Sequence, residues 1–430
     1  MKKFFRDLVF LVLLVALGYL GWRTLVLSRQ ARDLRDTVTQ LEKERREAEQ
    51  QQTDATAASA KPESSVRIRG EIEQATSELR GLPFKGPVHY KMIERVQLRD
   101  FLVKRFKQQY TDQQMRDYGR SLAAFGLVPD GTDLMNTIVA MYDEQVGAFY
   151  VPEERSLYTF KDLTWSGGLD RMLLSHELTH VLQDQNYDLT TFALRVKDND
   201  DLALAATALI EGDATLLMTR YYAENVDPTH MLSDLTAMLG QNTAKLAQAP
   251  PYLRELLLFP YTQGQQFASA LFAAGGTDAL NDAFRHPPTT TQQILHPDKF
   301  MHDRRDPQPP PVPAIDAPDW RLIGENVLGE FGLRSLLEQP LGLFESQQIA
   351  QGWAGDHYRV YEHGPGGATG LIWITDWDSE PDAAAFQDAY RNATRKPNLT
   401  VHLHQDGKRV TVRQSSDPAF FPLAEAALAH

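Results

Sequence analysis

His176-Glu177-Leu178-Thr179-His180 is the stretch of this sequence that decides the fold of its central part. An α-helix turns once in about 3.6 residues, so this spacing places the imidazoles of His176 and His180 on one face of a helix. Glu177 lies one step to the side, within reach of a water molecule on an ion that the imidazoles hold. The pattern therefore predicts a helix that binds a metal ion and activates its water.

The residues around this motif are almost entirely apolar. Residues 169–183 include Met172, Leu173, Leu174, Leu178, Val181 and Leu182. A helix of this composition is expected to be buried, where two imidazoles and a carboxylate are costly unless a cation and its water satisfy them. The alternative is a surface helix whose histidines and glutamate face solvent.

A third ligand is expected elsewhere, because catalytic zinc usually has three protein ligands and one open position. Cysteine is excluded, since the chain contains none. The best candidate is Glu211, which lies in a second apolar run at residues 202–222. Gly212 beside it removes a side chain where two helices would approach closely. Asp213 either orients a ligand histidine through its ring N–H or is a solvated surface aspartate.

His-Glu-x-x-His followed by a helix that carries Glu-Gly-Asp-Ala resembles the gluzincin group of zinc metallopeptidases, similar to the thermolysin-type and aminopeptidase-type enzymes. The resemblance covers about residues 142–222. It implies one Zn²⁺ held by His176, His180 and Glu211, with Glu177 as general base. The interval between His180 and Glu211 is longer than in the best-known members. The rest of the chain resembles membrane-anchored bacterial proteins.

Two β-branched and aromatic runs at 146–151 and 156–160 flank Pro152-Glu-Glu-Arg155 and predict a hairpin. Zincin-type enzymes place an edge strand beside the metal, where an extended peptide adds as a further strand. The hairpin would then supply that edge. A hairpin without any such role is the alternative.

Peptide hydrolysis at this site also needs a hydrogen-bond donor for the tetrahedral oxyanion. The candidates in the sequence are Tyr261, Tyr221, Tyr222, His286 and His296. Structural explanations compete with this role. Thr290 and Gln293 fit a helix capping box, and His296 before Pro297 fits a helix end.

The N-terminus predicts a membrane anchor. The basic residues Lys2, Lys3 and Arg6 precede an apolar run that extends to Leu27 and is interrupted by Arg23. This run is about long enough to cross a bilayer with Arg23 at the far interface, and the leading charges place the N-terminus in the cytoplasm. We expect a single-pass protein of the bacterial inner membrane with its bulk in the periplasm or outside the cell. A cleaved signal peptide is the alternative.

The chain is expected to have five parts. They are an anchor at 1–27, a helical stalk and flexible linker at 28–65, a zincin-like metallopeptidase domain at 66–303, a proline-rich linker at 304–318 and a small domain at 319–430. Apolar residues seven apart in the stalk suggest weak self-association as a coiled coil. Residues 66–127 have an amphipathic helical pattern with a break at Gly126.

The fold class expected is α+β, with a mainly helical zincin-like domain and its edge hairpin followed by a small α+β sandwich. In the latter we expect strands at 357–362, 371–375, 399–404 and 409–413, and helices at 381–394 and 420–428. His402 and His404 lie on one strand face, where they either bind metal or are simply exposed.

The net charge of −13 shows no basic footprint for nucleic acid, so the expected partners are a peptide or protein substrate and the membrane. Two classes of function stay open. One is an active zinc metallopeptidase, and the other is a catalytically silent zincin-fold binding or assembly factor at the cell envelope. Glu177 favours the first, because a protein without activity has no need of a general base.

Overall fold

The computed structural model describes residues 62–145, 147–163, 165, 167–192, 198–226, 234, 244–394 and 398–429. The predicted anchor and the stalk up to residue 61 lie outside these residues. The chain divides into the units Met1–Arg67 and Ile68–His430, and the elements that form the candidate sites belong to the second unit. The helix α2 (Pro62–Arg80) begins inside the segment predicted as a linker, with proline at a position that suits a helix start.

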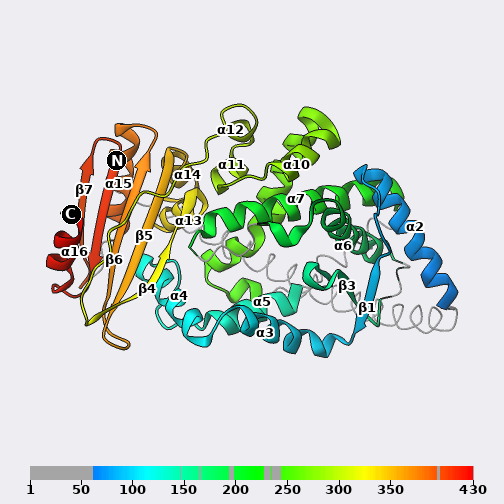
Figure 1. The fold of residues 1–430 in the computed structure, drawn as a ribbon, viewed down its shortest axis with the longest axis horizontal. Coiled ribbons are helices and arrows are strands. Elements are labelled where there is room, and N and C mark those ends of the chain that lie inside the picture. Colours follow the sequence, from blue (N-terminus) through cyan, green and yellow to red (C-terminus); the bar gives the residue numbers. More distant parts are fainter. Residues whose placement is uncertain are drawn as a thin grey trace, which may run out of the picture. The chain divides into compact units, whose positions relative to one another are not determined.

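Helices dominate the first half of the described chain (Figure 1). After α2 they are α3 (Leu98–Gln109), α4 (Asp112–Phe125), α5 (Leu134–Gln145), α6 (Gly168–Tyr187), α7 (Asp200–Asn225), α9 (Ala244–Gln248), α10 (Pro251–Arg285), α11 (Thr291–Leu295) and α12 (Pro297–Met301). The break predicted at Gly126 is confirmed, since this residue ends α4 with a φ of 83° that glycine adopts readily.

A three-stranded sheet lies beside these helices in the order β1-β3-β2. The predicted hairpin is confirmed as β2 (Ala148–Val151) antiparallel to β3 (Ser156–Phe160), with Arg155 in the turn at a φ of 46°. The strand β1 (His89–Ile93) pairs with β3 in parallel, so the helical pattern expected over residues 66–127 is wrong for this segment. In this sheet β2 is an edge strand.

Two glycines set the distance between α7 and α10. A Cβ atom on Gly212 would lie 2.1 Å from the carbonyl oxygen of Gly264, and one on Gly264 would lie 2.3 Å from that of Ala208. The two backbones can touch here because neither glycine has a side chain. The predicted role of Gly212 in a close helix approach is therefore confirmed.

Among the residues the structure describes, α7 is the helix whose length and apolar composition would suffice to cross a membrane. Several of its side chains are buried against neighbouring elements, among them Ala205, Ala208 and Leu209. Its buried polar residues Asp201 and Asp213 have hydrogen-bond partners on other helices. The apolar composition of α7 is thus accounted for by its place in a protein core.

The second half of the chain forms a five-stranded antiparallel sheet in the order β4-β5-β6-β8-β7. Its strands are β4 (Trp320–Asn326), β5 (Trp353–His363), β6 (Thr369–Trp377), β7 (Thr400–Asp406) and β8 (Arg409–Ser415). Its helices are α13 (Gly329–Leu341), α14 (Leu343–Ala350), α15 (Glu380–Ala393) and α16 (Phe420–Leu428). The four predicted strands and two predicted helices are confirmed, whereas β4, α13 and α14 were not predicted.

Both faces of this sheet are covered. Trp373 of β6 packs edge-on against Phe386 and Tyr390 of α15, while Ile372 shares a separate cluster with Phe420 of α16. Adjacent residues of a strand point to opposite faces, so α15 and α16 lie on opposite sides of the sheet. The expected α+β class is confirmed.

The helical part and the larger sheet share one hydrophobic core. Phe125 at the end of α4 makes edge-on ring contacts with Tyr358 and Trp373, at centroid distances of 4.9 and 5.2 Å. Residues 304–317 form neither helix nor strand, and the amide of Ile315 donates to the Tyr361 hydroxyl at 2.9 Å. The division into domains at 304–318 stays a prediction.

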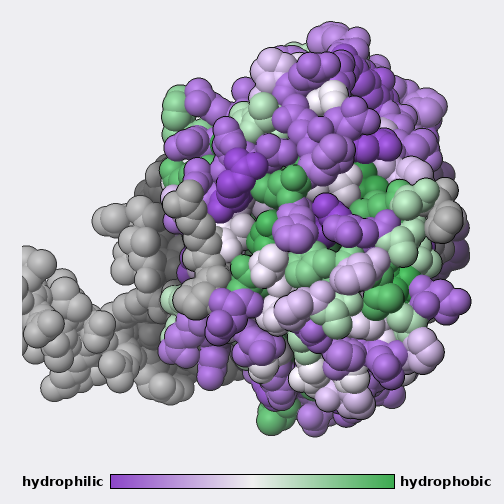
Figure 2. Space-filling model, turned by 90° about the vertical axis from the view of Figure 1, so that its left-hand side faces the viewer, coloured by the Kyte–Doolittle hydropathy of each residue, from purple (hydrophilic) through white to green (hydrophobic). Residues whose placement is uncertain are grey.

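The face at the sheet end of the molecule is mostly hydrophilic (Figure 2). Hydrophobic residues lie on it in small groups between polar ones. This mixture is ordinary for a protein surface in contact with water.

Candidate metal centre

The two helices α6 and α7 bring His176, His180 and Glu211 together. The Nε2 atoms of the two histidines lie 3.1 Å apart, and Oε2 of Glu211 lies 3.2 Å from that of His176 and 3.4 Å from that of His180. Both histidines are buried, and the Glu211 side chain is 20% exposed. The three groups that the sequence singled out thus converge on one point at the border of the core.

These separations fit a shared cation. Zinc binds imidazole nitrogen and carboxylate oxygen at about 2.0–2.2 Å, so two ligand atoms at a tetrahedral angle lie roughly 3.3–3.5 Å apart. The observed distances of 3.1, 3.2 and 3.4 Å come close to this range. Two imidazoles and a carboxylate suit Zn²⁺ and also other divalent transition metals. The residues present therefore fit a divalent cation.

The charges of the three groups also fit a bound cation. Burial lowers the pKa of His180, but the Glu211 carboxylate outweighs this effect and raises that pKa to about 9. Burial likewise raises the pKa of Glu211, but the two imidazoles outweigh it and hold that pKa well below its usual value. The carboxylate is thus ionised and attracts a positive charge, which is a proton on the imidazole or a metal ion in its place.

Gln183 holds the His180 ring. Its Oε1 atom lies 2.9 Å from Nδ1 of His180, while its Nε2 donates to Oδ2 of Asp213 at 2.9 Å and to the Ile210 carbonyl. Asp213 in turn accepts from Nε of Arg80 at 2.8 Å in a fully buried ion pair. The sequence suggested that Asp213 itself orients a ligand histidine. The structure places Gln183 against the ring, with Asp213 one step behind it.

The Nδ1 atom of His176 is buried and has no hydrogen-bond partner among the described residues. His180 is therefore the more firmly oriented of the two imidazoles, because its second nitrogen is fixed by Gln183.

Glu177 lies between the imidazoles and the edge strand β2. Burial raises its pKa, against the opposing effect of His176 and His180, and the backbone amide of Tyr150 donates to its carboxylate. A buried carboxyl with a raised pKa next to a metal-ligand cluster is a typical arrangement for a general base. The contact also shows that β2 lies directly against the site.

Tyr261 of α10 borders the same cluster. Its ring stacks on that of His176 with centroids 6.2 Å apart, and the residue is 37% exposed. Burial of the hydroxyl and the nearby Glu211 carboxylate hold the pKa of Tyr261 well above its ordinary value. The phenol stays protonated and is available as a hydrogen-bond donor. The contact of Gly264 with α7, one turn further along α10, brings this side chain to the site.

Tyr142 of α5 is a neighbour that the sequence analysis missed. Burial and the Glu211 carboxylate raise its pKa to about 12. Its phenol is therefore a second protonated hydroxyl in the vicinity of Glu211.

The other oxyanion candidates have partners of their own. Tyr221 is buried in a cluster with Leu174 and Leu178, and the hydroxyl of Tyr222 donates to Asp234 at 2.9 Å. Nδ1 of His286 lies 3.2 Å from Oδ1 of Asp282, and both side chains are largely exposed.

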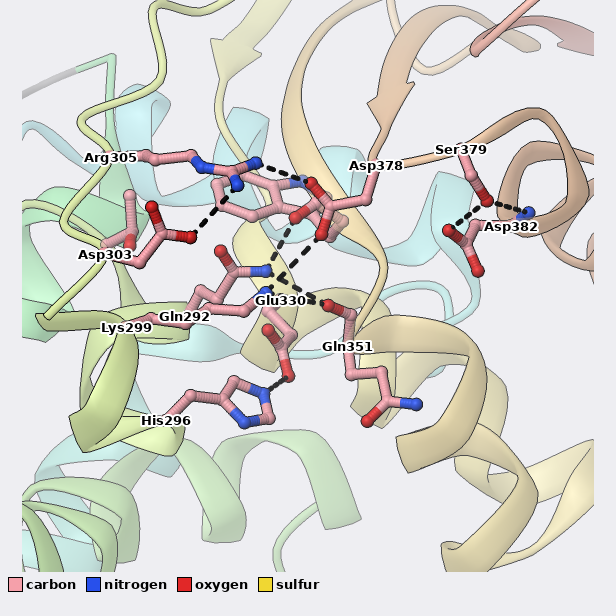
Figure 3. A network of polar contacts seen from close by, with 12 residues as sticks. Gln292, His296, Lys299, Asp303, Arg305, Glu330, Gln351, Asp378, Ser379 and Asp382 are labelled. Carbon is pink, nitrogen blue, oxygen red and sulfur yellow. Dashed lines mark hydrogen bonds and ion pairs between the residues drawn. The ribbon is translucent and has the colours of Figure 1, made fainter.

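His296 belongs to a polar network between α11, α12 and the C-terminal part (Figure 3). Its Nε2 lies 2.7 Å from Oε1 of the buried Glu330. Gln292 of α11, the helix that ends just before His296, donates to the backbone carbonyls of Gln351 and Trp353. The structure thus gives His296 a partner at this junction.

The remaining sequence candidates for metal binding are His402 and His404. His402 packs on the ring of Phe421 with centroids 4.4 Å apart. Within the described ranges, His176, His180 and Glu211 form the group of histidine and acidic side chains close enough to share an ion.

One of the missed residues carries a signal in the sequence and two do not. Gln183 follows His180 by three residues, so helix geometry alone places it on the same face. Tyr142 and Arg80 give no such signal, because tertiary packing brings them to the site from other helices.

Comparison with known proteins gives one result for the C-terminal part. Residues 320–421 match a family described as "Domain of unknown function (DUF8575)". This range begins with β4 and ends in α16, and none of the metal-centre residues lies within it. No curated protein and no solved structure matches the chain.

Proposed function

We propose that this protein is a zinc metallopeptidase of the gluzincin type, anchored in the bacterial inner membrane, that hydrolyses peptide bonds in a peptide or protein substrate. The observation that carries the proposal is the convergence of Nε2 of His176, Nε2 of His180 and Oε2 of Glu211 within 3.1–3.4 Å of one another. Glu177 and an edge strand lie directly beside them.

His176, His180 and Glu211 would hold the ion, which supplies a water of lowered pKa and polarises the scissile carbonyl. Glu177 would take the proton of that water and pass it to the leaving amine. Its raised pKa favours both steps, since a carboxylate that is too weak a base would not accept the proton.

The edge strand β2 would bind the substrate backbone. Backbone groups of a strand alternate between its two edges. Because the Tyr150 amide donates to Glu177, the amide and carbonyl of Ala148 face the same free edge. An extended peptide could pair with them and pass alongside the metal ligands, which supports a zincin-like arrangement.

Tyr261 is the best-placed donor for the oxyanion. Its protonated phenol borders the ligand cluster, and the residue as a whole is partly exposed. Removal of such a donor costs about two to three powers of ten in rate.

Metal content and peptide cleavage by the full-length protein in detergent test the proposal. The wild type should bind one zinc per chain and cleave peptides of a diverse library, whereas His176→Ala and His180→Ala should lose both zinc and activity. Stoichiometric zinc in both variants would show that the site lies elsewhere. Zinc that is lost in the variants, together with a wild type that cleaves nothing, would favour the binding or assembly factor.

A further inference from the structure

A cavity of about 570 Å³ opens at the end of α6 that follows the metal-binding motif. It is lined by the segment at residues 85–89, by Tyr150 and Arg155 of the hairpin and by residues 184–188 of α6 and its C-terminal cap. Three elements that are far apart in the sequence therefore form its walls.

The walls are held in place by hydrogen bonds. Oε1 of Gln185 accepts from the backbone amides of Lys85 and Gly86, and its Nε2 donates to the Gly86 carbonyl. Asn186 donates to the Pro83 carbonyl at 3.1 Å. The segment that carries Lys85 is thus pinned to α6 through its backbone.

The cavity adjoins the metal centre. Asp184 follows His180 by four residues, so it lies one turn, or about 6 Å, further along the same face of α6. Tyr150 connects the two places, because its amide donates to Glu177 while its hydroxyl donates to Oδ2 of Asp184 at 2.7 Å. A peptide on β2 would reach the cavity about two or three residues from the bond that is cleaved.

Positively charged residues line this cavity. Lys85, His89 and Arg155 line it and are exposed, and neither Lys85 nor Arg155 has an ion-pair partner in the part of the chain that the structure describes. This is unusual in a chain whose net charge is −13.

The two carboxylates in the wall accept hydrogen bonds from nearby groups. Asp184 accepts from the Tyr150 hydroxyl and from the Leu189 amide. Asp188 accepts from the amide and hydroxyl of Thr190. Among the described residues that line the cavity, the charged groups free to donate hydrogen bonds to a ligand are Lys85 and Arg155, while Oδ2 of Asp188 accepts none.

We infer that this cavity is a substrate subsite that binds an acidic side chain of the peptide, held by Lys85 and Arg155 two or three residues from the scissile bond. The inference rests on the proposed peptidase function and adds to it a class of substrate. A carboxylate in the cavity would receive charge-assisted hydrogen bonds from both cations.

The test compares peptides that differ only in carrying Glu, Gln or Lys at one position. That position is varied over the residues on both sides of the cleaved bond. With the full-length zinc protein, kcat/KM for the Glu peptide should exceed that for the Gln peptide by about tenfold when the substituted residue lies in the cavity. The factor is no larger because solvent screens the exposed charges. The preference should shrink as salt is added. In the double variant Lys85→Gln, Arg155→Gln the preference for the Glu peptide over the Gln peptide should disappear.

Lys161→Gln is the matched control, because Lys161 follows β3 and pairs with Glu94 away from the cavity. This variant should keep the full preference for the Glu peptide. A wild type that cleaves Glu, Gln and Lys peptides equally at every position would overturn the subsite while leaving the peptidase function intact.

If no peptide is cleaved, a binding measurement can still test the acidic subsite separately from the peptidase proposal. The affinity of the Glu177→Gln protein for the Glu and Gln peptides can be measured by calorimetry without turnover. A preference for the Glu peptide that is lost with Lys85 and Arg155 would support the cavity even though the peptidase proposal had failed. Equal affinities for the Glu and Gln peptides would contradict the acidic subsite as well.

Discussion

The amide of Gln183 lies 2.9 Å from Nδ1 of His180, on the side of the ring away from the Nε2 atom that faces Glu211. The same amide is held by the buried pair of Asp213 and Arg80. A ring fixed in this way presents its second nitrogen in one direction, which lowers the entropic cost of binding a metal.

Gln183→Leu should therefore weaken metal binding without removing a ligand. The loss of the ring's partner is expected to lower zinc affinity by about 10- to 100-fold. Titration against a competing chelator measures this change. Gln185→Leu is the control on the same helix, since Gln185 contacts residues 85 and 86 and no imidazole. Equal affinities in the wild type and Gln183→Leu would show that packing alone orients the ring.

Glu177→Gln should separate metal binding from turnover. The variant keeps the size of the side chain and removes the base, so zinc should stay bound while turnover falls by about two to four powers of ten. Elemental analysis and a peptide assay on the same sample provide the two readings. Full activity in this variant would exclude Glu177 as the general base.

Tyr261→Phe tests the oxyanion donor. The loss of the hydroxyl should lower kcat by about two to three powers of ten with little change in KM, because the hydrogen bond forms only in the transition state. Tyr222→Phe removes a hydroxyl bonded to Asp234 and should leave kcat nearly unchanged. If Tyr261→Phe behaves like this control, Tyr142→Phe is the next variant to examine.

Gly212→Ala should destabilise the fold. Its Cβ would lie 2.1 Å from the Gly264 carbonyl oxygen, so α7 and α10 must move apart, at a cost of about 3 kcal/mol. Chemical denaturation measures the free energy of unfolding. Gly70→Ala in α2 meets no atom within 4 Å and should instead stabilise by roughly 0.5–1 kcal/mol. Similar effects of the two substitutions would contradict the close helix contact.

Asp201 should make stability depend on pH. Burial raises its pKa to about 7, although the amide and hydroxyl of Thr291 both donate to its Oδ1. In the unfolded chain an aspartate titrates near pH 4, so between about pH 4 and 7 the unfolded state loses a proton that the folded state keeps. Stability from this group is thus present below about pH 4 and is lost as the pH rises to about 7.

Asp201→Asn keeps the acceptor for Thr291 and removes this titration. Relative to the wild type, the variant should gain stability between pH 4.5 and pH 7.5, by at most about 1.4 kcal/mol for each pH unit. The exposed Asp316 provides the control, and Asp316→Asn should follow the wild-type curve. Parallel curves for Asp201→Asn and the wild type would mean that Asp201 is ionised in the fold.

The sequence pattern was sufficient to predict those features that depend on residues close to one another in the chain. The convergence of His176 and His180 follows from helix geometry, and the hairpin of β7 and β8, which turns at Gly407 and Lys408, follows from a glycine between alternating strands. The position of Gln183 on the same helix face as His180 could also have been predicted from its spacing. Such features involve residues within a few positions of one another.

Long-range contacts explain what the sequence did not predict. The strand β1 forms because β3, more than sixty residues later, offers it a parallel partner, and its own burial pattern shows no regular alternation. The strand β4 likewise lacks strict alternation and starts beside the proline-rich segment. The role of the Tyr150 amide depends on the backbone, which the type of side chain does not reveal.

The contact between Gly212 and Gly264 also limits how this chain can evolve. Each glycine occupies space that the backbone of the other helix fills, so a side chain at either position is excluded while the helices keep their distance. Since Glu211 precedes one glycine and Tyr261 lies one turn before the other, a mutation that separates the helices also separates the ligand from the donor. In relatives that keep this site, the two positions are expected to be inherited as a pair.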